Sequence, residues 1–386
     1  MWRMLDFLNV LYVSQQPGNR TLPGARLEPW MANVKRLRQA KTNKTRTFRK
    51  SYIRNPSQIL YKPSQISHPI PQVPFATTTQ ISTQQRKQAA MIQNLISKYN
   101  LIENEPMSRH TSFRIGGPAD LYVSPDEKIL PQLLQDAKKE SLPITIIGNG
   151  SNLLVGDGGI RGLVIEIGKG MDSISIEDNV MTVGAGTLLS KAASTAASKG
   201  LSGMEFAAGI PGSIGGAVVM NAGAYGGEMK DIIVDASVIT KEGAIRTLSL
   251  EELDLSYRHS SIIENEYIVI GARLKLHQED EAKIRQVMDD LRDRRVEKQP
   301  LNFPSAGSTF KRPEGYFAGK LIMDAGLRGY TVGGAQVSEK HCGFVVNKGG
   351  ATASDVVKLM NDVKNKVMQE FGVELEPEVK MIGEFK

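Results

Sequence analysis

Three segments far apart in the sequence carry side chains whose chemistry is complementary. Ser308 lies in the small-residue turn 305–309, Arg258 lies upstream of it, and Glu378 lies in the closing segment 375–379. A hydroxyl can donate a proton, a guanidinium is a permanent cation, and a carboxylate is a base. Brought together, these groups are sufficient to protonate and stabilise a carbanion.

A second carboxylate, Glu376, lies two residues before Glu378. Residues two apart on an extended strand project to the same face of that strand. If this segment is extended, spacing alone leaves both carboxylates as candidates.

Two glycine-rich loops provide backbone that can approach a ligand closely. The first, 148–152, directly follows the β-branched segment 143–147, and the second runs over 209–217 and continues through 221–227. Residues without a bulky Cβ let successive backbone N–H groups point at an anion. The third glycine of the Rossmann fingerprint and the P-loop pattern are both absent. A tight turn after a strand is an alternative for the first loop, but two such loops favour a large cofactor extended between two lobes.

Apolar periodicity predicts the elements that must position these residues. Strands are expected at 121–123, 143–147, 163–167, 173–176, 180–183, 234–240, 245–250 and 268–276. Helices are expected at 91–99, 126–141, 187–199, 354–371 and from 279 onward. Thr187 is the expected N-cap of its helix. The helix after 279 should bury Ile284, Val287, Met288 and Leu291, and the helix 126–141 should turn Ile129, Leu133, Leu134 and Ala137 inward. The last helix, 354–371, should place on one face Val356, Leu359, Met360, Val363 and Val367. Strands mixed with segregated helices predict an α+β fold.

Composition separates a basic leader from a mildly acidic body. The 386 residues include 48 basic and 41 acidic ones, which gives a formal net charge of +7. Residues 1–90 hold 15 of the basic and two of the acidic residues, so 91–386 carry 33 basic against 39 acidic residues. The single cysteine, Cys342, excludes an internal disulfide and a cysteine-based metal cluster, and it fits a reducing compartment. No apolar run approaches the roughly 18–20 residues of a membrane span.

The leader, 1–90, has little apolar periodicity and is expected to be disordered or loosely attached. Its basic stretch 35–50 would suit a nucleic-acid-binding tail, but aromatic residues for base stacking are sparse. Its composition also permits a transit peptide. We favour a third interpretation, an upstream start codon with Met91 as the biological first residue, because recognisable folding signals begin there. Mass spectrometry of the native amino terminus would distinguish the three.

Together these motifs resemble a known enzyme family. The two glycine loops, Tyr257-Arg258, the Ala-Gly-Ser-Thr-Phe-Lys segment 306–311 and the Leu-Glu-Pro-Glu-Val segment 375–379 are similar to those of the UDP-N-acetylenolpyruvoylglucosamine reductases, in the same order. The resemblance covers about 91–386. The stretch 319–344 resembles the shorter, type II form, which lacks a substrate-covering insertion.

The resemblance implies an α+β architecture with two functional parts. A two-lobed FAD-binding domain of the vanillyl-alcohol-oxidase (PCMH) type is expected at 91–278, with lobes at about 107–165 and 166–278. A substrate-binding α+β domain is expected at 279–386. The implied cofactors are FAD and NADPH, and the implied substrate is UDP-N-acetylglucosamine enolpyruvate.

Residue roles also follow from the resemblance. Ser308 matches the proton donor, Arg258 the residue that grips the substrate carboxylate, and Glu378 the catalytic carboxylate that acts with Arg258. Substrate contacts are implied for Tyr257, Lys298, Lys311, Arg328 and His341. Implied FAD contacts come from both loops: Gly148, Asn149, Gly150, Ser151, Asn152, Leu153, Gly209, Ile210, Pro211, Gly212, Ser213, Gly216, Ala217, Asn221 and Gly223. No metal site is implied.

Two other function classes share some of these features. A different FAD-dependent oxidase or dehydrogenase, acting on an alcohol or sugar, would use the same loops, although no His or Cys context for covalent flavin attachment is apparent. A non-enzymatic nucleotide-binding protein would keep the loops but gain nothing from Ser308, Arg258 and Glu378. We expect a cytoplasmic enzyme that acts on small molecules, has no membrane or nucleic-acid partner, and is a monomer or weak homo-oligomer.

Overall fold

The computed structural model describes residues 83–385. Residues 95–385 belong to one compact unit, which carries the features discussed below, and 83–94 belong to another. Helix α2 (Thr83–Tyr99) contains the predicted helix 91–99 but begins eight residues earlier. The expectation of disorder is therefore wrong for residues 83–90, which are helical. The predictions for the leader up to position 82 lie outside the described residues.

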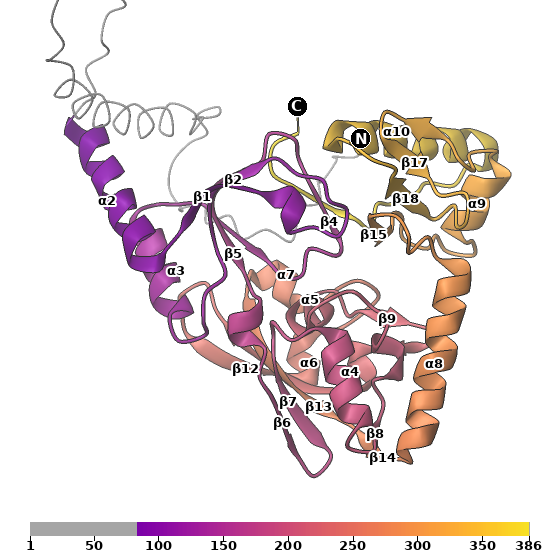
Figure 1. Cartoon of the computed structure of the whole chain (residues 1–386), viewed down its shortest axis with the longest axis horizontal. Helices are drawn as coiled ribbons and strands as arrows, with labels where there is room; N and C mark the ends of the chain where they lie inside the picture. The colour runs from indigo at the N-terminus through magenta and orange to yellow at the C-terminus, as the bar shows by residue number, and fades with distance from the viewer. Residues whose placement is uncertain (1–82, 386) are drawn as a thin grey trace, which may run out of the picture. The chain divides into compact units, whose positions relative to one another are not determined.

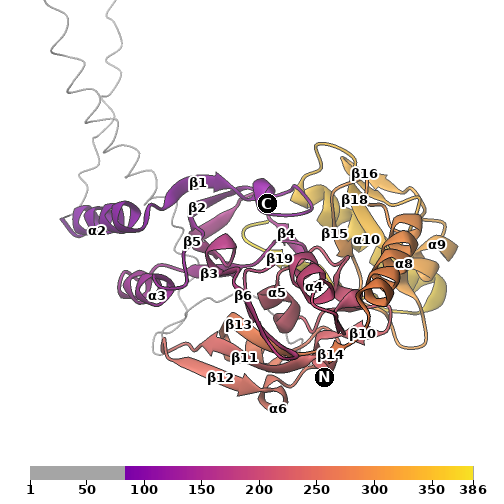
Figure 2. The same ribbon diagram turned by 60° about the horizontal axis from the view of Figure 1, so that its bottom comes forward.

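A four-stranded sheet with the order β1-β2-β5-β3 begins the large unit. Its first three strands are labelled in Figure 1, and all four are labelled in Figure 2. Strand β1 is antiparallel to β2, whereas β2 and β3 are parallel to β5. Helix α3 (Leu130–Lys139) is shorter than predicted, and of its expected inward face it buries Leu133 and Ala137, whereas Leu134 is half-buried and Ile129, its N-cap, is exposed. The strand bounds are β1 (Ile102–Pro106), β2 (Pro118–Val123), β3 (Ile144–Ile147) and β5 (Ile160–Glu166). Strand β3 therefore ends directly before the first glycine loop, as predicted.

A second, five-stranded sheet is antiparallel throughout and has the order β12-β11-β13-β7-β6. Its strands confirm the predicted ones: β6 (Ile174–Glu177), β7 (Val180–Gly184), β11 (Ile233–Ile239), β12 (Ile245–Ser249) and β13 (Ile268–Lys275). Two sheets of this kind with separate helices confirm the α+β class.

Helix α4 (Leu189–Ala197) shows that the predicted cap was wrong. The N-cap residue is Leu188, which makes no side-chain capping bond. Thr187 is fully buried, and its hydroxyl donates to the Ser173 carbonyl oxygen at 3.3 Å. The hydroxyl therefore satisfies a neighbouring backbone oxygen and does not cap the helix.

The C-terminal part contains a four-stranded antiparallel sheet with the order β15-β18-β17-β16. Its strands are β15 (Ser305–Ser308), β16 (Thr331–Val332), β17 (Ala335–Val337) and β18 (Phe344–Asn347), and α9 (Ala318–Asp324) lies between β15 and β16 in sequence. Helix α10 (Ala353–Phe371) follows β18. It buries the whole predicted face: Val356, Leu359, Met360, Val363 and Val367.

Helix α8 (Glu281–Lys298) corrects a prediction about burial. Of the expected apolar face only Ile284 is buried, while Met288 and Leu291 are half-buried and Val287 is 47 % exposed. The helix lies beside α4 (Figure 2). Ion pairs spaced three or four residues apart run along its exposed surface. Such pairs stabilise a helix without a broad buried face.

The end of the chain returns to the first part of the unit. Strand β19 (Lys380–Ile382) pairs in parallel with β4 (Leu153–Val155), the strand that directly follows the first glycine loop (Figure 2). The Asp157 carboxylate also accepts hydrogen bonds from the first backbone N–H groups of α10, those of Ala353 at 2.8 Å and Ser354 at 2.9 Å. These contacts fix the C-terminal sheet against the first glycine loop. The predicted domain boundary at 278 stays a prediction.

The remaining elements are short: α5 (Ile214–Val219), α6 (Leu250–Leu253), α7 (Ser261–Asn265), β8 (Leu201–Ser202), β9 (Gly223–Ala224), β10 (Gly227–Glu228), β14 (His277–Gln278), and the 3₁₀ helices η1 (Met107–Arg109), η2 (Lys169–Met171), η3 (Glu205–Ala207) and η4 (Met229–Asp231). Within residues 83–385, no helix is long and apolar enough to span a bilayer, and no group of three or more His, Cys, Asp or Glu residues has the geometry of a metal site.

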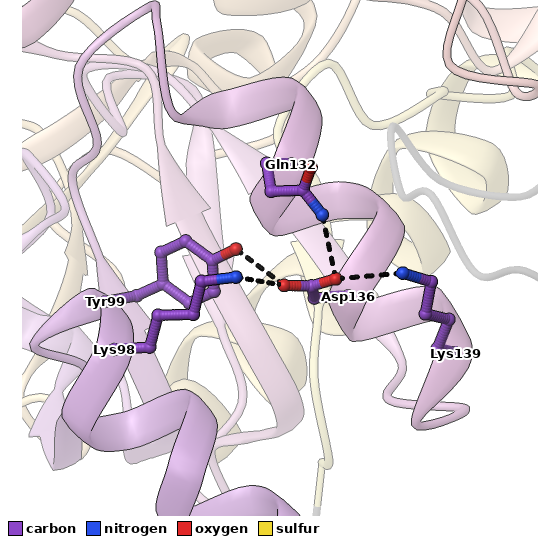
Figure 3. Close-up of polar contacts among 5 residues, drawn as sticks. All are labelled: Lys98, Tyr99, Gln132, Asp136 and Lys139. Atoms are coloured by element: carbon purple, nitrogen blue, oxygen red, sulfur yellow. Dashed lines mark hydrogen bonds and ion pairs between the residues drawn. The ribbon is translucent and has the colours of Figure 1, made fainter.

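Asp136 on α3 joins the last turn of α2 to α3 (Figure 3). Its carboxylate accepts hydrogen bonds from Lys98 Nζ at 2.7 Å and from the Tyr99 hydroxyl at 2.8 Å, and also from Gln132 and Lys139. These donors, Lys98 first, hold the pKa of Asp136 well below its usual range. The ionised carboxylate therefore favours the folded state.

We expect Asp136→Ala to destabilise the last turn of α2 by about 1–3 kcal/mol, the range for hydrogen bonds to a charged group. Because the pKa of Asp136 is lower in the folded protein, its contribution is complete above about pH 5 and is lost as the pH falls below about 4. Hydrogen exchange at residues 95–99 measures the effect. Lys139→Gln is the matched control, since an exposed pair three residues apart contributes a few tenths of a kcal/mol. Equal exchange in both variants would contradict this account.

Candidate active site

A cavity of about 580 Å³ lies between the two glycine loops and the C-terminal sheet. Both loops line it, and so do Arg258, Ser308 and Glu378. The three side chains singled out from the sequence therefore share one cavity, although up to 120 residues separate them along the chain.

The first loop is held by contacts that only small residues permit. Gly150 has φ +61°, and a Cβ at this position would lie 1.9 Å from the carbonyl oxygen of His110. The Asn149 amide donates to the Pro211 carbonyl oxygen at 2.8 Å, which ties the first loop to the second. The Asn152 amide donates to the Glu378 carbonyl oxygen at 3.1 Å, which ties the same loop to the end of the chain. These two amides thus brace the loops.

Several polar groups around the cavity have no partner within the described residues. The Ser213 hydroxyl, on the second loop, is buried without a hydrogen bond, and a Cβ on Gly148 would lie 2.8 Å from it. The backbone N–H groups of Asn149, Gly150 and Ser151 donate to no described acceptor. Unused donors on closely approaching backbone are what an anionic ligand requires. The cavity therefore fits a nucleotide that contains a diphosphate, such as FAD.

Arg258 and Glu378 form an ion pair inside the cavity. The Arg258 Nε donates to Glu378 Oε1 at 2.5 Å, and the two side chains are 20 % and 12 % exposed. This bond uses only the Nε–H of the guanidinium, so its remaining N–H groups stay available to a ligand. The pair can present a fixed, oriented cation to the cavity.

The turn around Arg258 is held in an unusual backbone conformation. Arg258 has φ +57°, and Ser256 and His259 exchange backbone hydrogen bonds across it. Asn221, fully buried, donates from its amide to the Ser256 carbonyl oxygen at 3.2 Å. A left-handed conformation at a non-glycine residue persists only where the surroundings enforce it. Asn221 is therefore a positioning residue for Arg258.

Glu378 reaches the cavity through an irregular strand pairing. Its backbone N–H donates to the Thr309 carbonyl oxygen at 2.9 Å, and the Lys311 N–H donates to the Glu376 carbonyl oxygen at 2.8 Å. Glu376 pairs with Lys311 and is 67 % exposed, whereas Glu378 is 12 % exposed. The structure therefore separates the two carboxylates that spacing left open: Glu378 lines the cavity and Glu376 does not.

Ser308 ends strand β15, directly after Gly307 with φ +76°. Thr309, the next residue, is buried, and its hydroxyl accepts a hydrogen bond from the Val345 N–H at 2.9 Å. The Ser308 side chain is exposed to the cavity and has no hydrogen-bond partner among residues 83–385. The strand thus fixes the backbone and leaves the hydroxyl free to bond a ligand.

Comparison with known proteins identifies the family. The FAD binding domain family matches residues 120–249, and the family described as "UDP-N-acetylenolpyruvoylglucosamine reductase, C-terminal domain" matches residues 299–382. A UDP-N-acetylenolpyruvoylglucosamine reductase of Agathobacter rectalis is 60 % identical over 302 residues, which cover 75 % of this chain and 96 % of that protein. The chain belongs to the UDP-N-acetylenolpyruvoylglucosamine reductase family.

Two further members of the reductase family support the same assignment. The reductase of Clostridioides difficile is 54 % identical over 292 residues, covering 75 % of this chain and 96 % of that protein. The crystal structure of the reductase from Thermus caldophilus matches 72 % of this chain and 97 % of that chain, with a TM-score of 0.63 and 36 % identity. The chain is an FAD-dependent oxidoreductase with the predicted fold, an FAD-binding domain followed by the C-terminal domain of the reductase family.

Of the residues expected from the resemblance to the reductase family, the FAD-binding ones line the cavity and the substrate-binding ones do not. All of the expected FAD-binding residues line the cavity except Asn221, which instead braces the turn of Arg258. None of the five expected substrate contacts lines it. Tyr257 is 51 % exposed, and its hydroxyl accepts from the Arg312 N–H at 3.3 Å, while Lys311 pairs with Glu376.

The other three expected substrate residues of the reductase family lie on the C-terminal part of the chain. Lys298 is exposed at the end of α8. Arg328 is also exposed and donates to the Glu339 carbonyl oxygen and to Met323 Sδ. His341 accepts at Nδ1 from the Gly343 N–H at 3.1 Å, and burial lowers the pKa of its imidazole. Their roles in substrate binding stay predictions.

The cavity residues that the sequence analysis did not single out include three cations: Arg292, Arg295 and Lys380. Lys380 could have been noticed, because it lies two residues after Glu378 on the same extended face. Burial, and then the nearby charge of Lys311, lower the pKa of Lys380. Cys342 is buried in the core of the C-terminal part, and burial raises the pKa of its thiol.

Proposed function

We propose that this chain reduces UDP-N-acetylglucosamine enolpyruvate to UDP-N-acetylmuramate with NADPH as the reductant, in the cytoplasmic stage of peptidoglycan precursor synthesis. The single observation that carries the proposal is one cavity lined by both glycine loops and by Arg258, Ser308 and Glu378. Family membership supports the same reaction. Bound FAD would supply the hydride that goes to C3 of the enolpyruvyl group.

Addition of hydride at C3 places negative charge at C2, which spreads into the adjacent carboxylate. The guanidinium of Arg258 is oriented by Glu378 and is the fixed cation that this charge requires. A preoriented cation in a partly desolvated site stabilises developing charge without reorganisation. The planar fork also suits both oxygens of a carboxylate.

Ser308 supplies the proton. Its hydroxyl has no competing hydrogen-bond partner among the described residues, so it is free to direct its proton toward C2 of the substrate. A serine is a weak acid, but the C2 carbanion is far more basic, so transfer of the proton from Oγ to C2 is favourable. Hydride at C3 and a proton at C2 together complete the reduction of the double bond.

Glu378 acts through Arg258 in this proposal. Ionised and bonded to Nε, it fixes the plane of the guanidinium. Lys380 adds a second partly buried cation on the same face of the strand. Two cations offset the carboxylate, so the cavity can still attract an anionic substrate.

The decisive experiment measures NADPH oxidation by the full chain with and without UDP-N-acetylglucosamine enolpyruvate. Oxidation that depends on the substrate, with UDP-N-acetylmuramate as product, supports the proposal. Flavin reduction by an alcohol or sugar with oxygen as acceptor, and no response to the enolpyruvate, would favour the alternative oxidase function.

The second glycine loop offers a direct test of cofactor binding. A Cβ on Gly212 would meet no protein atom closer than 3.5 Å, so Gly212→Ala should fold normally. If FAD lies against this loop, the methyl group should weaken FAD binding about 5- to 100-fold, the range for overpacking by one carbon. Gly150→Ala is the comparison, because its Cβ would strike the His110 oxygen and destabilise the protein itself. FAD affinity equal to that of the unsubstituted protein in Gly212→Ala would place the cofactor elsewhere.

A further inference from the structure

Arg295, near the end of α8, has a buried nitrogen without a hydrogen bond. Its Nε donates to Gln299 Oε1 at 2.9 Å, but Nη1 is buried and bonds to no atom of residues 83–385. Burial lowers the pKa of this guanidinium. Arg295 and Gln299 both line the large cavity.

The other arginines of α8 are ion-paired. Arg285 pairs with Glu281, Arg292 with Asp289, and Arg294 with Asp290, each at 2.7 Å. Arg295 has no ion pair within the described part of the chain. Arg295 is half-buried, and a cation partly removed from water without a partner is unfavourable. In the functioning protein, Arg295 therefore calls for an anionic partner that the described residues do not supply.

The second glycine loop accommodates this cation closely. A Cβ on Gly209 would lie 2.8 Å from Arg295 Nη1, so a larger residue at 209 would push the guanidinium away. Ser213, four residues further along the same loop, carries the other unpartnered buried donor that lines the cavity. Two unused donors, one of them charged, border one glycine loop.

We propose that Arg295 binds a diphosphate oxygen of a nucleotide held in this cavity. A guanidinium matches phosphate geometry, and a charge-assisted bond in a partly desolvated site is strong. The inference rests on the proposed function only in that FAD and the UDP-sugar both carry a diphosphate. The ligand is either the resident FAD or the UDP-sugar that exchanges during turnover.

The test uses the full-length holoprotein with Arg295→Met, which keeps the bulk of the side chain and removes its charge. Dilution of the holoprotein, followed by the rise in flavin fluorescence, gives the Kd of FAD. Titration with UDP-N-acetylglucosamine, followed by the change in flavin absorbance, gives the Kd of a UDP-sugar that cannot turn over. Arg294→Met is the matched control, because Arg294 is exposed on the same helix and pairs with Asp290.

Loss of one charge-assisted bond should raise a dissociation constant about 10- to 100-fold. A rise for FAD alone assigns Arg295 to the cofactor diphosphate, and a rise for the UDP-sugar alone assigns it to an exchanging nucleotide. Both constants within twofold of those for Arg294→Met would overturn the inference. A lower melting temperature with both constants unchanged would also overturn it and would make Arg295 a packing residue. Neither measurement requires reduction of the enolpyruvate, so failure of the proposed function would be seen separately.

Discussion

Replacement of Ser308 by alanine is expected to slow reduction of the enolpyruvyl substrate about 10²- to 10⁴-fold, the usual contribution of a positioned proton donor. Flavin reduction by NADPH should stay nearly unchanged, because that half-reaction needs no proton at C2. Stopped-flow absorbance of the flavin measures the two half-reactions separately. The substitution removes only an unbonded hydroxyl from the end of β15, so the fold should be retained.

Ser308→Cys is the control for this experiment. A thiol is a stronger acid than a hydroxyl and has a similar size, so part of the lost rate should return. An equal loss in both half-reactions of Ser308→Ala would instead indicate damage to the flavin site. It would then remove Ser308 from the role of proton donor.

The sequence predicted those parts of the fold whose signals are local. The strands of both large sheets and the buried face of α10 followed from apolar spacing, because those elements bury one continuous face. The same criterion gave a wrong prediction for the buried face of helix α8. Its apolar residues have the helical period, yet Val287 remains 47 % exposed, because the helix packs along one narrow side and ion pairs cover the rest.

The site shows a similar division. Glycine loops and the Ser308 turn were visible from composition, but the choice of Glu378 over Glu376 depended on the family resemblance. Physically, that choice depends on the pairing of the chain end with residues 309–311, a long-range contact without a sequence period. Arg295 could not be singled out from the sequence, because α8 carries several arginines and the others form ion pairs on its surface. Only the close approach of Arg295 to Gly209, a contact between distant segments, distinguishes it from them.

The ion pair between Arg258 and Glu378 should have the largest effect on stability. Arg258→Met leaves the Glu378 carboxylate, 12 % exposed, without its partner. We expect a loss of about 2–4 kcal/mol in the free energy of unfolding, since breaking a buried pair strands a charge. The substrate half-reaction should also slow about 10²- to 10³-fold, because the group that stabilises the developing charge is gone.

The double variant Arg258→Met with Glu378→Gln separates these two effects. With neither charge present, most of the lost stability should return, while the substrate half-reaction should stay slow. Unfolding of the holoprotein at a fixed FAD concentration measures the first, and stopped-flow absorbance the second. Glu376→Gln is the control for stability: its pair with Lys311 is largely in water and should contribute less than about 1 kcal/mol. The free energy of unfolding is also measured for each single variant, Arg258→Met and Glu378→Gln. If their two losses simply added in the double variant, the Glu378 carboxylate would have another partner. Glu378 would then not act by orienting Arg258.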